Sequence, residues 1–178
     1  MRYLTLSLIL FLTACSGGGG QSVIDPIDEL PKVIAPEPDP TPTGTASYRG
    51  PTTLAFVPVL STAVNLTGTM SLDVDFDGGT EPVTGFASGF ETASGAAVTG
   101  QLFLSGGSLN DTDTALLMSS QLSGSLRSGT DSYLISGQMT GEVLEDNQSA
   151  IAGRISGIAQ QLGRNAPLSG SFQAGRVP

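Results

Sequence analysis

The 178-residue chain contains no histidine and no tryptophan, and it has one cysteine, Cys15, and one lysine, Lys32. Without histidine the Ser-His-Asp and Cys-His arrangements of hydrolases cannot be built, and zinc loses its commonest nitrogen ligand. One cysteine allows no disulfide within the chain, so packing and hydrogen bonds must hold the fold. The sequence therefore predicts a protein that is not an enzyme, with no catalytic residues and no metal site.

Basic side chains are also scarce. The chain has 7 Lys and Arg against 16 Asp and Glu, for a formal net charge of −9. An acidic chain without a basic cluster is repelled by phosphate backbones, so no nucleic-acid partner is expected. The length suits one domain plus a tail.

The amino terminus has the features of a targeting signal. Residues 4–12 form an apolar run that is too short to cross a bilayer, which takes about 20 residues, but has the length of a signal-peptide core. The residues that follow resemble the lipobox of bacterial lipoproteins: Leu12, Thr13, Ala14 and Cys15. The resemblance implies a signal peptide over residues 1–14 and lipid attachment to Cys15. The alternative is an ordinary secretory signal that ends near a buried or free cysteine.

The lipid on Cys15 would be the membrane anchor, because the acidic chain has no polybasic patch to hold anionic lipid. No cofactor is expected beyond this covalent lipid. By resemblance to Gram-negative lipoproteins, Ser16 after the cysteine favours the outer membrane over the inner one. The domain is expected at the cell surface, with the periplasmic face as the alternative.

Residues 15–44 are expected to form a disordered tether. Four consecutive glycines, 17–20, are followed by six prolines between Pro26 and Pro42. Such a segment favours extended polyproline II at ~3.1 Å per residue and excludes helix and central strand. Apolar residues between 23 and 34 leave open a short segment that packs on the domain or forms a brief helix.

From Thr45 to Pro178 apolar and polar residues alternate in short segments. The clearest run, Leu66 to Asp77, alternates without a fault, which is typical of a strand with one buried face. Weaker runs cover 83–91, 97–105, 115–127, 132–143, 151–157 and 168–172. Residues 52–58 are expected to form a further strand, and residues 47–50 to open the barrel. Turn signals between them include Gly78-Gly79, Gly106-Gly107 and 163–167. About eight strands at this spacing predict an all-β fold, a single small soluble antiparallel barrel.

Many glycines of this domain occupy strand positions that share a face with the apolar residues, as Gly137 does between Ile135 and Met139. Glycine weakens a strand unless curvature or close packing requires it, and barrel strands require both. A membrane barrel would instead need an outward apolar band with aromatic girdles. The pattern therefore favours a soluble barrel with a filled interior.

The domain resembles a known family. Leu72 to Phe76 followed by Gly79-Thr80, Gly153 to Gly157, and the closing 168–172 are similar to the barrel domain of transferrin-binding protein B. The resemblance covers about residues 46–176, and the same surface lipoproteins carry a lipobox and a Pro/Gly tether. It implies an eight-stranded soluble barrel, surface exposure and protein binding. Those relatives have two lobes with a handle domain beside each barrel, whereas this chain has room for one barrel and no handle.

Three aspartates, Asp73, Asp75 and Asp77, precede Gly78 with the spacing of an EF-hand calcium loop. The twelfth position, which needs a bidentate glutamate, is Thr84. The strict alternation around these aspartates favours a solvated strand face over a calcium site or a glycosidase pair.

The first functional hypothesis is a binding module that contacts a protein ligand through its loops. The candidate ligand residues are Asp77, Glu81, Asn110, Asp111, Asp113, Glu145, Asp146 and Asn147. Because these loops are mostly acidic, a basic partner surface is preferred. The alternatives are a structural or envelope-accessory lipoprotein without a dedicated ligand, and a barrel that holds a small ligand.

Overall fold

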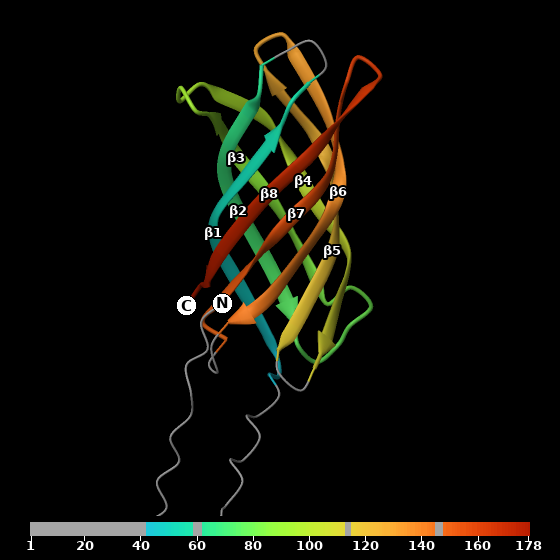
Figure 1. Cartoon of the computed structure of the whole chain (residues 1–178). Helices are drawn as coiled ribbons and strands as arrows, with labels where there is room; N and C mark the ends of the chain where they lie inside the picture. The colour runs from blue at the N-terminus through green and yellow to red at the C-terminus, as the bar shows by residue number, and fades with distance from the viewer. Residues whose placement is uncertain (1–41, 59–61, 113–114, 145–147) are drawn as a thin grey trace, which may run out of the picture. The chain divides into compact units, whose positions relative to one another are not determined.

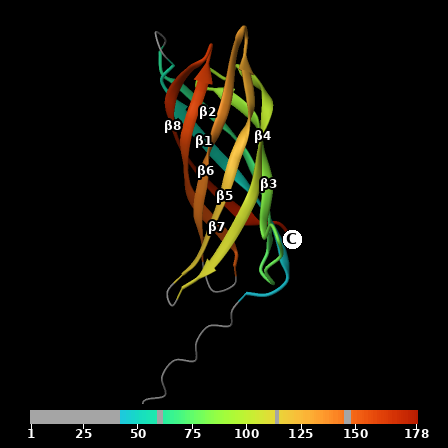
Figure 2. The same ribbon diagram turned by 90° about the vertical axis from the view of Figure 1, so that its right-hand side faces the viewer.

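The computed structural model describes residues 42–58, 62–112, 115–144 and 148–178, which belong to a compact unit, Asp39–Pro178. The strands are β1 Thr45–Phe56, β2 Val64–Asp75, β3 Val83–Thr92, β4 Ala97–Asp111, β5 Leu116–Ser128, β6 Asp131–Leu144, β7 Ala150–Gln161 and β8 Arg164–Arg176. Each strand pairs antiparallel with the next and β1 pairs with β8, so the sheet closes into a barrel (Figures 1 and 2). The predicted all-β barrel of eight antiparallel strands is confirmed. The predicted signal peptide, the lipobox residues and nearly all of the tether lie outside the described residues, as do Asp113 and residues 145–147.

Because successive strands run in opposite directions, the connections alternate between the two ends of the barrel. We call the end where β1 begins the entry end; it also holds the turn at 76–82 and the ends of β4 and β6. The other end, which we call the far end, holds the turns at 93–96, 129–130 and 162–163 and the end of β1. Figure 1 shows the two ends at the bottom and the top of the barrel.

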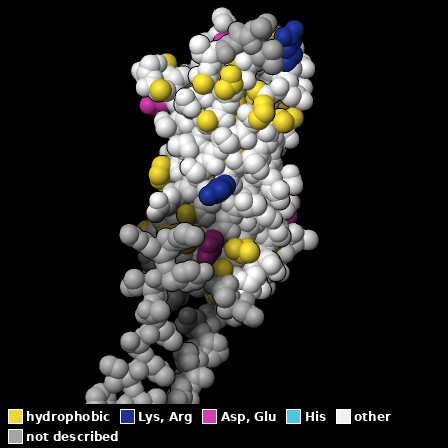
Figure 3. Space-filling view, in the orientation of Figure 1, with side chains coloured by type: hydrophobic (Ala, Val, Ile, Leu, Met, Phe, Trp, Pro, Cys, Tyr) yellow, Lys and Arg dark blue, Asp and Glu magenta, His cyan; other side chains and the backbone are white. Residues whose placement is uncertain are grey.

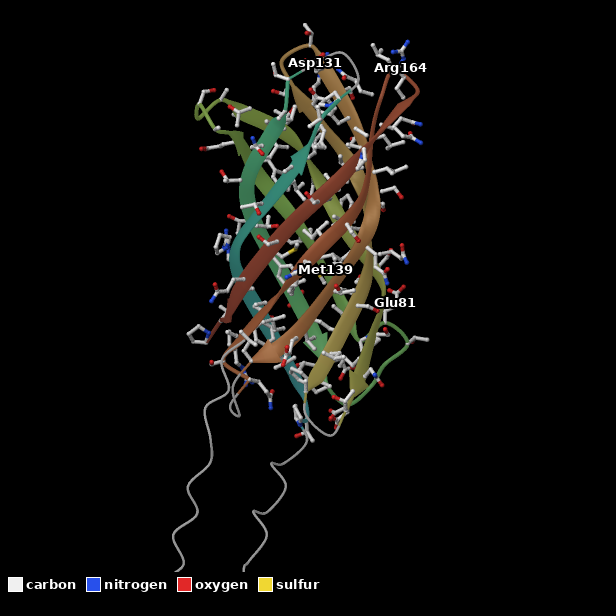
Figure 4. The ribbon with its side chains drawn as sticks, in the orientation of Figure 1. Glu81, Asp131, Met139 and Arg164 are labelled. Carbon is white, nitrogen blue, oxygen red and sulfur yellow. The ribbon has the colours of Figure 1, made fainter. Side chains whose placement is uncertain are left out.

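The barrel interior is filled by apolar side chains, which occupy every second position of the strands and face inward. In β2 the buried residues are Leu66, Met70, Leu72 and Val74, as the alternation predicts. The other seven strands contribute to the same cluster, which includes Met139 near the middle of the barrel (Figure 4). Burial of this apolar surface is the main source of stability for a chain that has no disulfide.

Among the described residues, one threonine and one serine are buried in this interior, and both are satisfied. Thr52 Oγ1 donates to the carbonyl of Ser171 at 3.1 Å, and Ser120 Oγ donates to the carbonyl of Ser105 at 2.9 Å. Among the described residues no buried side-chain nitrogen or oxygen lacks a partner. The core therefore carries no cost from an unpaired polar group.

The inward glycines lie where neighbouring strands approach too closely for a side chain. Gly137 and Gly157 face each other across β6 and β7. A Cβ on Gly157 would come within 3.0 Å of the Ser136 carbonyl oxygen and of the Gly137 Cα. Curvature of the closed sheet thus depends on glycine at these positions, as the placement of the glycines among the inward-facing residues predicts.

Two predicted turns were wrong in position. Gly106-Gly107 lies inside β4, where the register shifts between Ser105 and Ser108, so these glycines form a bulge and not a turn. The last hairpin turns at Leu162 and Gly163, and β8 has already begun at Arg164, so residues 165–167 belong to a strand. In both cases glycine or proline marked a local irregularity that the chain accommodates within a strand.

Candidate functional site

The structure brings the described candidate residues to the entry end of the barrel. Asp77 and Glu81 lie in the turn between β2 and β3, and Asn110 and Asp111 are the last residues of β4. Asn110 and Asp111 are therefore exposed strand residues, and their expected placement in a loop was wrong. β6 ends and β7 begins at this same end, at Leu144 and Ala150.

The aspartates of the calcium-like motif are used in hydrogen bonds of the fold. Asp73 Oδ1 accepts from Ser47 Oγ at 2.6 Å, and Asp77 Oδ1 accepts from the backbone N–H of Gly44 at 2.9 Å. Asp75 Oδ1 accepts from the backbone N–H of Asp77 at 3.1 Å. Two of these bonds attach the start of β1 to β2 and to the turn that follows it. In the described part of the chain no three acidic residues gather as a metal site would require.

Among the candidate residues that the structure describes, the acidic groups left over for a ligand are Glu81 and Asp111. Both are exposed, and no described residue forms an ion pair or a hydrogen bond with either side chain. Asn110, also exposed, lies beside Asp111 and adds an amide that can both donate and accept. A cationic side chain on a partner could therefore approach this end without displacing a bond that the fold needs.

Each end of the barrel has a buried tyrosine. At the entry end the Tyr48 hydroxyl donates to the carbonyl of Gln148 at 3.0 Å. Burial raises the pKa of Tyr48, and the charge of Arg176 opposes part of that rise. At the far end Tyr133 packs edge-on against Phe56, with ring centroids 5.0 Å apart. Burial and the carboxylate of Asp131 both raise the pKa of Tyr133.

The interior and the outer wall offer different possibilities for a ligand. Leu72, Leu102, Leu122, Met139 and other large side chains occupy the interior and are almost fully buried, which weighs against a small ligand held inside. The outer wall has a hollow of about 440 Å³ over β4 to β7. Leu117 and Ala152 line it, and Glu142 and Arg154 lie at it without an ion-pair partner among the described residues.

Sequence reasoning missed this hollow and the exposed apolar residues of the far end. The hollow adjoins the end of β4 beyond the bulge at Gly106-Gly107, where the sequence pattern predicts a turn. The far end has a fully exposed leucine, Leu162, immediately before Gly163 in the last hairpin. The sequence signal for this exposed leucine is a leucine followed by glycine between two segments with the strand pattern.

A comparison with protein families finds no match to this chain, and a search of curated proteins finds none either. The similarity to the barrel of transferrin-binding protein B thus stays a prediction from short motifs. The described residues include no helix with the length and apolar character needed to span a membrane.

Proposed function

We propose that the chain is a lipoprotein of the outer membrane, anchored through Cys15, whose barrel binds a protein ligand without catalysis at the cell surface. The lone cysteine after Leu12, Thr13 and Ala14 supports the anchor. The similarity to the barrel of transferrin-binding protein B supports a protein as the ligand. The periplasmic face is the alternative location.

One observation carries the binding proposal: the described acidic candidates Asp77, Glu81 and Asp111 gather at one end of a closed, filled barrel. A filled barrel can meet a ligand only with its outer wall and its ends. At the entry end Glu81 and Asp111 are exposed and unpaired among the described residues. Such carboxylates attract a basic partner and speed its approach, and the effect weakens as salt rises.

The wall of the barrel supports a domain that works in water. In β5 and β6 the outward positions are mostly serine, threonine, glutamine and arginine, while the inward ones are mostly apolar or glycine. Membrane barrels have the reverse arrangement, with an apolar outer band and a polar interior.

A structural or envelope-accessory role is the second candidate. It is favoured by the use of Asp73 and Asp77 in hydrogen bonds that hold the start of β1. A structural protein needs such bonds for its fold, and acidic side chains then need no ligand. Deletion of the gene would separate the two roles, because an accessory protein is expected to affect envelope integrity even when no ligand is present.

The binding proposal is tested by capture with the soluble domain, Thr45 to Pro178, from intact cells and from host or environmental fluids. We expect one protein to be retained saturably and to be released by salt. The double variant Glu81→Gln/Asp111→Asn should lower its affinity by about two- to thirtyfold, since exposed ion pairs contribute about 0.2–1 kcal/mol each.

Glu91→Gln is the matched control, because Glu91 is also an exposed glutamate but lies at the far end of β3. It should leave the affinity unchanged. Equal loss in Glu81→Gln and Glu91→Gln would show that overall charge matters and that the entry end is not the site. Protease treatment of whole cells would show which side of the outer membrane the barrel faces.

A further inference from the structure

The last hairpin of the barrel carries a leucine in an unfavourable place. Gln161 and Arg164 form the last pair of β7 and β8, and the two residues between them, Leu162 and Gly163, have φ values of 49° and 77°. Two positive φ values define a type I′ turn, whose first central position favours asparagine, aspartate or glycine. Leu162 is 95% exposed, so its side chain adds nothing to the core. A contact outside the barrel would account for a leucine that the fold itself does not use.

Other exposed apolar residues lie on the wall below this turn. Ile158 of β7 pairs directly with Pro167 of β8. Leu134 of β6 pairs with Gln160 and is therefore a diagonal neighbour of Ile158 on the same face of the sheet. Pro167 and Val57 line the same hollow at the end of β1. Val57, Leu134 and Ile158 are 58%, 55% and 41% exposed. Figure 3 shows hydrophobic side chains gathered in the upper part of the barrel, toward the far end. We call Leu162 with these four residues the apolar end surface.

Charge is distributed unequally along the barrel. The described charges toward the entry end are Asp73, Asp75, Asp77, Glu81, Asp111, Glu142, Arg49, Arg154 and Arg176, while those at the far end are Glu91, Arg127, Asp131 and Arg164. Figure 4 shows Asp131 and Arg164 at the far end and Glu81 toward the opposite one. Among the described residues the far end is thus balanced, whereas the entry end has six acidic against three basic side chains. An anionic surface would repel the entry end and accept the far end, where neither arginine has an ion-pair partner among the described residues.

We propose that the apolar end surface is a lipid-contacting site for an anionic phospholipid bilayer. Leu162 and its apolar neighbours enter the boundary between headgroups and acyl chains, where buried apolar area provides the affinity. Arg164, two residues from Leu162, and Arg127 on the adjacent hairpin donate hydrogen bonds to phosphate oxygens. The acidic entry end then points away from the bilayer.

This orientation, which rests on the proposed lipid anchor, would leave Glu81 and Asp111 free for a basic ligand. The residues between Cys15 and Thr45 allow it: 29 residues extended at ~3.1 Å each reach about 90 Å. A barrel strand of 12 residues, tilted by about 40°, spans only about 30 Å along the axis. The chain is therefore long enough for the far end to reach the membrane that holds the lipid.

The proposal is tested with the mature chain, residues 15–178, carrying Cys15→Ser so that no lipid is attached. Flotation with vesicles of phosphatidylcholine and phosphatidylglycerol should show binding that exceeds binding to phosphatidylcholine alone. Leu162→Asn should weaken the binding about tenfold, which is the effect of removing one exposed leucine from the contact. Asparagine suits a type I′ turn, so the melting temperature of this variant should stay the same or rise.

Phe103→Ser is the matched control, because Phe103 is 57% exposed on the wall of β4 and lies outside the apolar end surface. It should bind vesicles as the parent does. Absence of vesicle binding, or equal binding by Leu162→Asn, would overturn the proposal. Concentration-dependent self-association that Leu162→Asn abolishes would assign the surface to a second copy instead. Failure of the anchor itself is a separate result, because it would appear as unchanged membrane fractionation of the full chain after Cys15→Ser.

Discussion

Replacing Gly157 by alanine tests whether glycine permits the barrel to close. Gly157 pairs with Gly137 of β6 on one side and with Leu168 of β8 on the other. The added Cβ would collide with the Ser136 carbonyl oxygen and lie 2.5 Å from the Gly137 Cα. Both are backbone atoms of a strand that is itself paired on its other side, so the neighbour cannot rotate away as a side chain would.

The expected cost follows from this rigidity. Overpacking a core typically costs about 1–3 kcal/mol, and a collision with paired backbone belongs at the upper end, about 3 kcal/mol. For a domain of this size that loss lowers the melting temperature by about 10 °C. Urea unfolding followed by far-ultraviolet circular dichroism is the suitable assay, because the chain has no tryptophan.

Gly175→Ala is the control on the same sheet. A Cβ at Gly175 would meet nothing within 4 Å, and loss of glycine's freedom in the unfolded chain should stabilise the domain by about 0.4–1 kcal/mol. If Gly157→Ala unfolds within about 0.5 kcal/mol of the parent, close approach of β6 and β7 does not limit closure and the reasoning fails. Equal damage from both variants would refute it too.

Three further predictions follow from the ends of the barrel and from the proposed anchor. Tyr48→Phe removes the hydrogen bond to Gln148 and should lower the free energy of unfolding by about 1 kcal/mol in the same urea assay. The folded state holds the phenol protons of Tyr48 and Tyr133 more tightly than the unfolded chain does, since both pKa values are raised. Their contribution to stability is therefore fully present below a pH of about 10 and is lost as the pH rises through the raised pKa values, so phenol ionisation should coincide with alkaline unfolding in a spectrophotometric titration. Cys15→Ser should move the full chain from the membrane to the soluble fraction, and a chain that stays on the membrane would contradict the proposed lipid anchor.

The strands were predictable because their signal is local. In β2 every second residue from Leu66 to Val74 had to be apolar or glycine to fill one side of a closed sheet, and the sequence shows this directly. The glycines predicted the curvature of the sheet, because a flat sheet has no need of glycine at the buried positions of its strands. Bulges were harder, since Gly106-Gly107 in β4 has the composition of a turn and only the partner strand decides between the two.

Which candidate residues would meet was a question of topology, and local pattern does not contain it. If the connection after β2 had crossed to the other end of the barrel, Glu81 at the end of that connection would lie away from Asp111. In the observed order each strand pairs with the next, so the connections that follow β2, β4 and β6 share the end where β1 starts. The same order sends Leu162 to the opposite end, together with Val57. A ligand site at the acidic entry end and a lipid contact at the far end are therefore compatible on one barrel, and a variant at one end should leave binding at the other end unchanged.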